Sequence, residues 1–235
     1  HTSKISKLDD LFTISSLGFR GEALASIASV AQLSIISSSG SGEGVELSIN
    51  NGRLGELIPA ANINGTQVTI RDLFYNTPAR RKFLKSPRTE GRKIIEMVRR
   101  FGLSRPNIGF SLIVDGKKVI DLFPEELKDR IGSLFDNTYK TNLIPIQISK
   151  ADYTFTGFVG NLNIIRKRFG EQFLFMNGRY IKDRLLNSAV YSSYQSLVKR
   201  GEYPFFVINI QIPYEQVDVN VHPMKTEVRF HDEWR

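Results

Sequence analysis

The sequence has no cysteine and only three histidines among its 235 residues. Without thiols it can form neither a disulfide framework nor a thiolate metal site, and this composition suits a cytoplasmic protein. With so few ligands of these two kinds, we predict no metal site among its residues. The sequence also lacks an apolar run long enough to span a bilayer, and it shows no signal peptide, so we predict no membrane partner.

Positive charge is in excess, because 32 lysines and arginines against 24 acidic residues give a net charge of +8 and a pI near 9.7. This balance favours an anionic partner such as nucleic acid over a neutral one. Hydrophobic residues make up 41% of the chain, which is enough for packed cores. We predict two domains, at residues 1–123 and 124–235, because the pattern of the sequence changes after Pro124.

Alternating apolar residues and turn signals predict an α+β fold. In the first domain we expect strands at residues 33–36, 45–49, 66–72, 108–114 and 119–122, and helices at 24–31, 79–84 and 90–101. In the second domain we expect helices at 125–135 and 183–199, and strands at 144–148, 154–160, 173–176, 205–212 and 217–221. Polar and apolar residues alternate along residues 66–72, so that strand should be half-buried.

The segment Gly-Phe-Arg-Gly-Glu-Ala-Leu at residues 18–24 is the first candidate binding element. Gly18 and Gly21 permit a tight backbone approach, and a helical apolar pattern begins at Leu24. A glycine turn that leads into a helix directs backbone N–H groups toward an anion such as a nucleotide phosphate. The Gly-x-x-Gly spacing alone is more typical of an ordinary loop that enters a core helix.

The full heptapeptide resembles a signature of the MutL family of DNA mismatch repair proteins, members of the GHKL group of split ATPases. Further segments carry the same resemblance: Thr2 to Ile5, Gly65-Thr66, Asp72 to Leu84, Asn177 to Arg179, and Asp218 to Lys225. It implies the back half of a GHKL ATPase sandwich at residues 1–123, followed by a ribosomal-S5-like transducer domain at 124–235. Because His1 is not an initiator methionine and the first residues already lie inside a family motif, we expect an N-terminally truncated fragment.

The resemblance implies binding of ATP and Mg²⁺. The residues expected to contact the nucleotide are Thr2, Ser3, Gly18, Phe19, Arg20, Gly21, Glu22 and Thr66. Thr66 matches the family position that helps bind the adenine edge, on an inward strand position, and Lys225 matches the catalytic lysine that reaches the γ-phosphate from the second domain. The family's catalytic glutamate and Mg²⁺ ligands are expected upstream of His1, so we expect this chain alone to hydrolyse no ATP.

Arg179, Lys182 and Arg184 are the predicted DNA-binding residues. Arg179 follows a predicted strand in an Asn-Gly-Arg motif and resembles the arginine implicated in DNA binding by this family. We predict backbone contacts to single- and double-stranded DNA with little sequence preference, so affinity should fall with salt. The resemblance also implies a MutS-type partner, homo- or heterodimerisation through the N-terminal region, and a cytoplasmic location in a bacterium or a nuclear one in a eukaryote.

The prediction from sequence is therefore a MutL-type mismatch repair protein, whose ATP-driven clamp on DNA couples mismatch recognition to downstream repair. Two alternatives stay open. A gyrase-B-like topoisomerase ATPase has a similar fold and lysine, although the sequence from Pro78 to Leu84 argues against it. A non-catalytic DNA-binding or scaffolding module would use the basic surface without any nucleotide.

Overall fold

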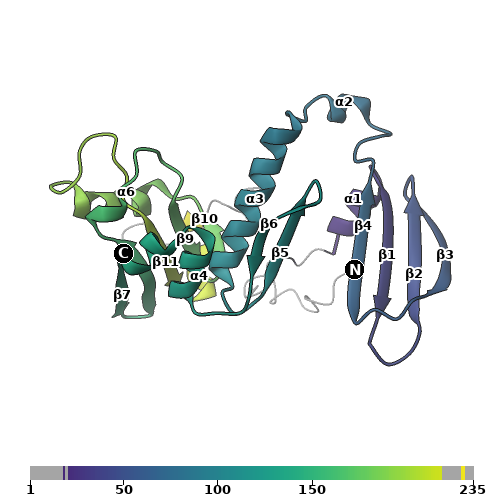
Figure 1. Cartoon of the computed structure of the whole chain (residues 1–235), viewed down its shortest axis with the longest axis horizontal. Coiled ribbons are helices and arrows are strands. Elements are labelled where there is room, and N and C mark those ends of the chain that lie inside the picture. Colours follow the sequence, from purple (N-terminus) through teal and green to yellow (C-terminus); the bar gives the residue numbers. More distant parts are fainter. Residues whose placement is uncertain (1–17, 19–20, 219–228, 231–235) are drawn as a thin grey trace. The chain divides into compact units, whose positions relative to one another are not determined.

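The computed structural model describes residues 18, 21–218 and 229–230, and it shows an α+β protein (Figure 1). Contacts between residues divide the chain into two compact units. Within the described residues, the first unit comprises Gly18–Glu90 and the second begins at Gly91. The α+β class predicted from the sequence is confirmed.

The first unit is built on one antiparallel sheet with the strand order β3-β2-β1-β4. Its elements are α1 (Ala23–Ala28), β1 (Gln32–Ser38), β2 (Gly44–Asn50), β3 (Arg53–Ala60), β4 (Gly65–Arg71) and α2 (Pro78–Arg81). Asn51 and Gly52 form the tight turn between β2 and β3, and both have the positive φ that such a turn requires. The sequence analysis missed β3 as a strand, because Gly55 and Pro59 interrupt its pattern.

The two faces of this sheet differ in polarity. On one face, Ser34 Oγ donates a hydrogen bond of 2.8 Å to Glu46 Oε1. The strand register places apolar side chains together on the other face: Leu33, Ile35, Leu47, Ile49, Leu54, Leu57, Val68 and Ile70. Leu33 is buried, whereas Leu54 is 72% exposed and Val68 is 44% exposed. The prediction of a half-buried strand at residues 66–72 is therefore wrong for β4, since no described element of the unit covers this part of the apolar face.

The second unit contains a mixed sheet with the strand order β10-β9-β11-β8-β7. β9 and β11 are parallel neighbours, and the other pairs are antiparallel. A separate hairpin, β5-β6, turns at Asp115-Gly116 as predicted. The elements are α3 (Pro87–Ser104, whose first turn belongs to the first unit), β5 (Phe110–Val114), β6 (Lys117–Leu122), α4 (Leu127–Leu134), α5 (Asn137–Thr141), β7 (Leu143–Lys150), β8 (Tyr153–Gly160), η2 (Leu162–Ile164), β9 (Gln172–Met176), β10 (Arg179–Ile181), α6 (Arg184–Tyr194), β11 (Phe206–Gln211), η3 (Tyr214–Gln216), β12 (Val217–Asp218) and β13 (Arg229–Phe230).

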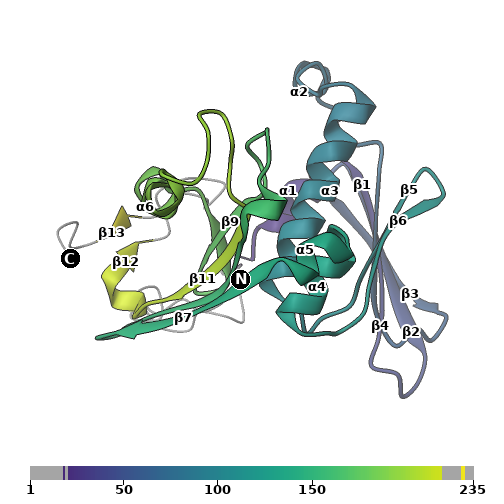
Figure 2. The ribbon, with the colours of Figure 1, turned by 60° about the vertical axis from the view of Figure 1, so that its left-hand side comes forward.

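Each face of the second sheet supports its own hydrophobic core. Successive side chains of β9 point to opposite faces, so Phe173 and Phe175 join one core while Leu174 and Met176 join the other. Helices α3, α4 and α5 pack against the first core, and α6 packs against the second (Figure 2). All five residues of β9 are buried as a result.

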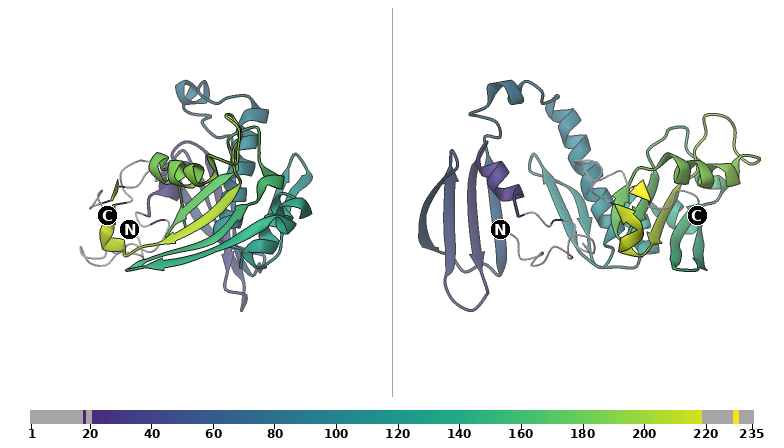
Figure 3. Two further views of the ribbon diagram at one scale, coloured as in Figure 1. Left: turned by 90° about the vertical axis from the view of Figure 1, so that its left-hand side faces the viewer. Right: turned by 180° about the vertical axis from the view of Figure 1, so that it is seen from behind.

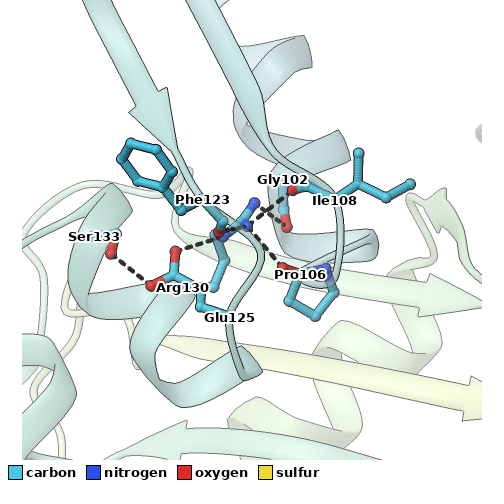
Figure 4. A network of polar contacts seen from close by, with 7 residues as sticks. All are labelled: Gly102, Pro106, Ile108, Phe123, Glu125, Arg130 and Ser133. Atoms are coloured by element: carbon cyan, nitrogen blue, oxygen red, sulfur yellow. Dashed lines mark hydrogen bonds and ion pairs between the residues drawn. The ribbon is translucent and has the colours of Figure 1, made fainter.

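A buried arginine joins α3, the β5-β6 hairpin and α4 (Figure 4). Arg130 is 0% exposed, and its Nε donates to Glu125 Oε1 at 2.8 Å. The remaining guanidinium nitrogens donate to four backbone carbonyls, those of Gly102 at 3.2 Å, Pro106 at 2.7 Å, Ile108 at 3.0 Å and Phe123 at 2.6 Å. This network binds segments on both sides of Phe123 into one unit.

The division between the compact units falls between Glu90 and Gly91, whereas the predicted domain boundary lies near Phe123. The Arg130 network accounts for the difference, because it holds the hairpin and the end of α3 against α4. The predicted boundary separates the two domains that the family resemblance implies, whereas the division after Glu90 separates two groups of residues by their contacts. Residues 1–123 and 124–235 therefore remain the predicted domains.

Three features of the second half differ from the prediction. The short elements α5 and β10 were not predicted, and α6 ends at Tyr194 instead of near Lys199. Near the end of α6, Ser192 Oγ donates to Ala189 O at 2.8 Å and Ser193 Oγ donates to Val190 O at 2.7 Å. Such side-chain bonds compete with the helical hydrogen bonds, which explains why the helix stops early. In the first half, α1 and α2 are likewise shorter than predicted.

Candidate functional site

The glycine segment at residues 18–24 is described at Gly18 and from Gly21 onward. Gly18 is exposed, and Gly21 has a φ of +67°, a left-handed conformation that glycine adopts without strain. Helix α1 begins two residues later, with Glu22 at its N-cap position. The Glu22 side chain makes no capping hydrogen bond, so it leaves the first amides of α1 to other acceptors. The predicted helix start is present, and the turn before it includes Phe19 and Arg20, which lie outside the described residues.

Residues 72–76, which carry part of the family resemblance, form a corner that holds the end of α1. Two of them have left-handed φ angles, +51° and +65°. Tyr75 Oη donates to Asn51 Oδ1 at 2.6 Å, and Asn76 Nδ2 donates to the same oxygen at 3.1 Å. Asn76 Nδ2 also donates to Ser29 O at 2.9 Å, just beyond α1. This motif therefore fixes α1 to the β2-β3 turn.

Thr66 lies in β4 opposite Ser37 of β1, and the two hydroxyl oxygens are 2.8 Å apart. Thr66 lies two residues before Val68 in the strand, so its side chain is on the same apolar face. It is exposed on that face and not buried. Helix α1 leads into the other end of β1. That end, at Gln32, lies roughly 17 Å along the strand from Ser37, the partner of Thr66. The structure places both Gly21 and Thr66 in the first unit.

The turn that precedes Arg179 is held on several sides. Asn177 and Gly178 have left-handed φ angles of +48° and +77° and join β9 to β10. Asn177 Nδ2 donates to Ile212 O at 2.9 Å, and Ile212 N donates to Asn177 Oδ1 at 3.1 Å. Ser104 Oγ donates to Gly178 O, and an added Cβ at Gly178 would lie 2.6 Å from an Arg105 guanidinium nitrogen. Asparagine and glycine are therefore required here by the geometry of the turn.

Arg179 is half-buried at the start of β10, and burial lowers the pKa of its guanidinium. An arginine remains charged at neutral pH all the same, because its ordinary pKa lies so far above 7. Alternation along β10 puts Arg179 on the same face as buried Ile181. Lys182 and Arg184 follow and are exposed, on either side of Asp183, whose Oδ1 accepts from the backbone at the start of α6. The three predicted DNA-binding cations thus lie at the start of β10, just after its end, and at the first residue of α6.

The sequence analysis missed a cation–aromatic contact on the opposite face of β10. The Arg100 guanidinium carbon lies 4.1 Å from the centre of the Tyr180 ring, and Arg100 Nε lies 3.4 Å from Glu96 Oε1. Burial raises the pKa of the Tyr180 hydroxyl. The four-residue spacing of Glu96 and Arg100 indicates a helical ion pair. Their position next to Tyr180 could not be predicted without β10.

Several predicted site residues lie outside the described residues: Thr2, Ser3, Phe19, Arg20 and Lys225. Among the residues that the structure describes, no group of three acidic or histidine side chains could hold a metal ion. None of the helices in the same part of the chain is long and apolar enough to cross a membrane.

Comparison with known proteins agrees with these motifs. The family described as "DNA mismatch repair protein, C-terminal domain" matches residues 131–235. Over 235 residues, the chain is 39% identical to the DNA mismatch repair protein MutL of Geotalea daltonii, covering 100% of this chain and 39% of that protein. It is 43% identical to MutL of Clostridium botulinum over 234 residues, which is 99% of this chain and 35% of that protein. The ATPase domain of Aquifex aeolicus MutL complexed with ADP superposes with a TM-score of 0.66 at 26% identity, over 88% of this chain and 76% of that one.

The fold and the matched sequences define a DNA mismatch repair protein with homology to an ATPase domain. The chain belongs to the MutL family and corresponds to the N-terminal ATPase region of its members. This confirms the predicted family over the gyrase-B-like alternative. The chain spans about two fifths of the length of the relatives that it matches.

Proposed function

We propose that this chain is part of an ATP-dependent clamp, in which the first unit contacts the nucleotide and the second contacts the DNA backbone. The observation that carries the DNA-binding part is the construction of the turn before Arg179. Four hydrogen-bonding groups fix Asn177 and Gly178, so the position of Arg179 is set before any ligand arrives. Preorganisation of this kind is typical of a binding residue.

The described residues of the first unit fit a nucleotide. The backbone around Gly21 and the first turn of α1 would hold phosphate oxygens, and the exposed hydroxyl of Thr66 would bind the adenine edge. The Aquifex relative is a MutL ATPase domain complexed with ADP. In this proposal Lys225 neutralises charge at the γ-phosphate, and the Mg²⁺ ligands and the general base come from segments of the whole protein that this sequence does not contain.

Bound ATP would supply the phosphoanhydride bond whose cleavage resets the clamp. The contributions of this chain are to bind, orient and couple, because contacts made only in one nucleotide state bias the protein toward one arrangement. The exposed apolar face with Leu54 and Val68 supports a further covering element in the whole protein. A MutS-type partner and dimerisation through the N-terminal region are part of the proposal. These 235 residues alone would act as the alternative, a DNA-binding module, because we propose that they hydrolyse no ATP.

The test of the DNA site is the charge reversal Arg179→Glu, measured by fluorescence anisotropy with a single-stranded oligonucleotide and a duplex between 50 and about 200 mM salt. Loss of one phosphate contact predicts weaker binding to both ligands and a salt slope lower by about 0.7 for the single strand and about 0.9 for the duplex. Lys117→Glu is the matched control, because Lys117 is exposed on the β5-β6 hairpin and the substitution changes the charge equally. Unchanged affinity at low salt in a folded Arg179→Glu protein would remove Arg179 from the site.

A further inference from the structure

Two surface loops of the second unit combine into one cationic surface. The first loop joins β8 to β9 and the second joins α6 to β11, and they lie side by side in Figures 1 and 3. We name the exposed residues that they contribute the loop patch: Arg166, Lys167, Arg168, Phe169, Lys199 and Arg200. No part of the proposed DNA site at Arg179 belongs to this patch.

The two loops are fixed to each other by backbone and ring contacts. Arg166 N donates to Tyr203 O at 2.9 Å, and Tyr203 N donates to Arg166 O at 2.7 Å. The Phe169 and Tyr203 rings meet edge to face, with centres 5.7 Å apart. The Tyr203 ring also meets the Tyr191 ring edge to face, with centres 5.9 Å apart. The cations of the two loops are therefore held near one another, although more than thirty residues separate them in the sequence.

Positive charge dominates this surface because its two nearby carboxylates are already engaged. Glu171 Oε2 pairs with Arg166 Nε at 3.1 Å and accepts a hydrogen bond of 2.5 Å from a tyrosine hydroxyl. Glu202 Oε2 accepts from the backbone N of Lys199 at 2.9 Å. In the described part of the chain, Lys167, Arg168 and the side chains of Lys199 and Arg200 form no ion pair. These four cations remain available to an anionic ligand.

Phe169 adds an aromatic ring to the cations. It is 66% exposed, although transfer of a phenylalanine side chain out of water is favourable by about 1.5–3 kcal/mol. An exposed ring beside several cations is the combination that single-stranded nucleic acids require, because the cations follow the phosphates while a base stacks on the ring. A duplex keeps its bases stacked inside and could use only the cations.

We propose that the loop patch is a second nucleic-acid contact, which binds single-stranded DNA through its phosphates and through stacking of one base on Phe169. β9 runs from this patch toward Arg179, so the two sites are separated by about 17 Å along the strand. A strand bound at both sites would cross the same sheet. The inference rests on the proposed DNA binding at Arg179, and it assigns to the patch the preference for single strands.

The test uses the 235-residue chain and fluorescence anisotropy with a labelled thirty-nucleotide oligo-dT and a thirty-base-pair duplex. The variants are Lys167→Glu/Arg168→Glu, Phe169→Ala and Arg179→Glu. The matched control is Lys117→Glu/Lys128→Glu, which changes the net charge equally at two exposed lysines of the same unit. Thermal unfolding establishes that each variant is folded.

The charge-reversal pair should weaken oligo-dT binding by about tenfold or more and lower the salt slope by about 1.4, the value for two phosphates of a single strand. Phe169→Ala should weaken oligo-dT binding at least about fivefold, the lower end for one stacked base, with no change in salt slope and less than a twofold effect on the duplex. The control pair should change neither ligand by more than about twofold.

Each of the following results would overturn the proposal. Equal losses in the control pair and in Lys167→Glu/Arg168→Glu would show that only net charge matters. An oligo-dT affinity unaffected by Phe169→Ala would exclude stacking of a base on this ring. If Arg179→Glu weakens binding while the patch variants do not, the loop patch fails and the proposed function stands. If no variant weakens binding, both fail.

Discussion

Replacing Arg130 with methionine tests what holds α3, the β5-β6 hairpin and α4 together. Methionine retains much of the length and apolar volume of the side chain but none of its donors. The substitution removes the guanidinium donor from four carbonyls, of which Pro106 O still accepts from Glu125 N at 2.9 Å. It also leaves the Glu125 carboxylate, whose side chain is 20% exposed, without its cation. Ser133 Oγ, 3.0 Å from the other Glu125 oxygen, cannot replace that charge.

The expected loss follows from the type of interaction. Removing one partner of a buried ion pair costs about 3–5 kcal/mol. Each unsatisfied carbonyl would add about 1–3 kcal/mol if it stayed dry, but carbonyls that share one guanidinium do not contribute additively. We therefore expect a loss of about 4 kcal/mol in the free energy of unfolding. At about 2–4 °C per kcal/mol for a unit of this size, Tm should fall by about 8–16 °C.

The assay is urea and thermal unfolding followed by circular dichroism, with hydrogen exchange to locate the change in the second unit. Arg130→Lys keeps the charge but has three donors in place of five, so its loss should be intermediate. Lys128→Met on the exposed side of α4 is the control and should change stability by less than about 0.5 kcal/mol. A loss below about 1 kcal/mol for Arg130→Met would refute the argument that this network stabilises the unit.

Two further predictions concern single groups. Gly178→Ala places a side chain at φ +77° against Arg105, so it should cost about 1–3 kcal/mol and also weaken DNA binding at Arg179; a variant with normal Tm and DNA affinity would contradict the account of the turn. Burial and a hydrogen bond to Glu171 raise the pKa of Tyr139 in the folded state above its unfolded value of 10.0, so the stability from this hydroxyl is present below pH 10 and is lost as the pH rises further. Tyr139→Phe should cost about 1 kcal/mol at pH 8 and flatten the fall in Tm between pH 9 and 11, whereas parallel curves for both proteins would exclude this hydroxyl as the cause.

The sequence predicted the α+β class, most strands and the family, because each depends on local patterns. Alternation located β5 and β7, and the Asp115-Gly116 turn located the β5-β6 hairpin. It failed where the pattern was broken or short, as in β3 with Gly55 and Pro59. The three-residue strand β10 has too few residues to alternate visibly, although the Asn177-Gly178 dipeptide is a hairpin signal that could have revealed it.

Burial could not be predicted in the same way, because it depends on what covers a face. The alternation of Val68 and Ile70 is real, and the register does place them on one apolar face, yet both are exposed. Conversely, Arg130 is a charged residue on a predicted helix, and nothing in its neighbours indicates that it is fully buried. Its partners lie up to 28 residues away in the sequence and meet only after folding.

The motifs that carried the resemblance therefore divide into two physical kinds. The corner at residues 72–76 and the Asn177-Gly178 turn are structural, since their side chains bond to the protein itself and hold α1 and β10 in place. Thr66, Lys182 and Arg184 are exposed and Arg179 is half-buried, so solvent reaches these residues of the second kind. The matched sequences establish the family, and motifs of the first kind are positions at which those sequences share a fold. Only residues of the second kind can specify what is bound, and for that reason the variants proposed for DNA binding change Arg179 and the loop patch while leaving the turn intact.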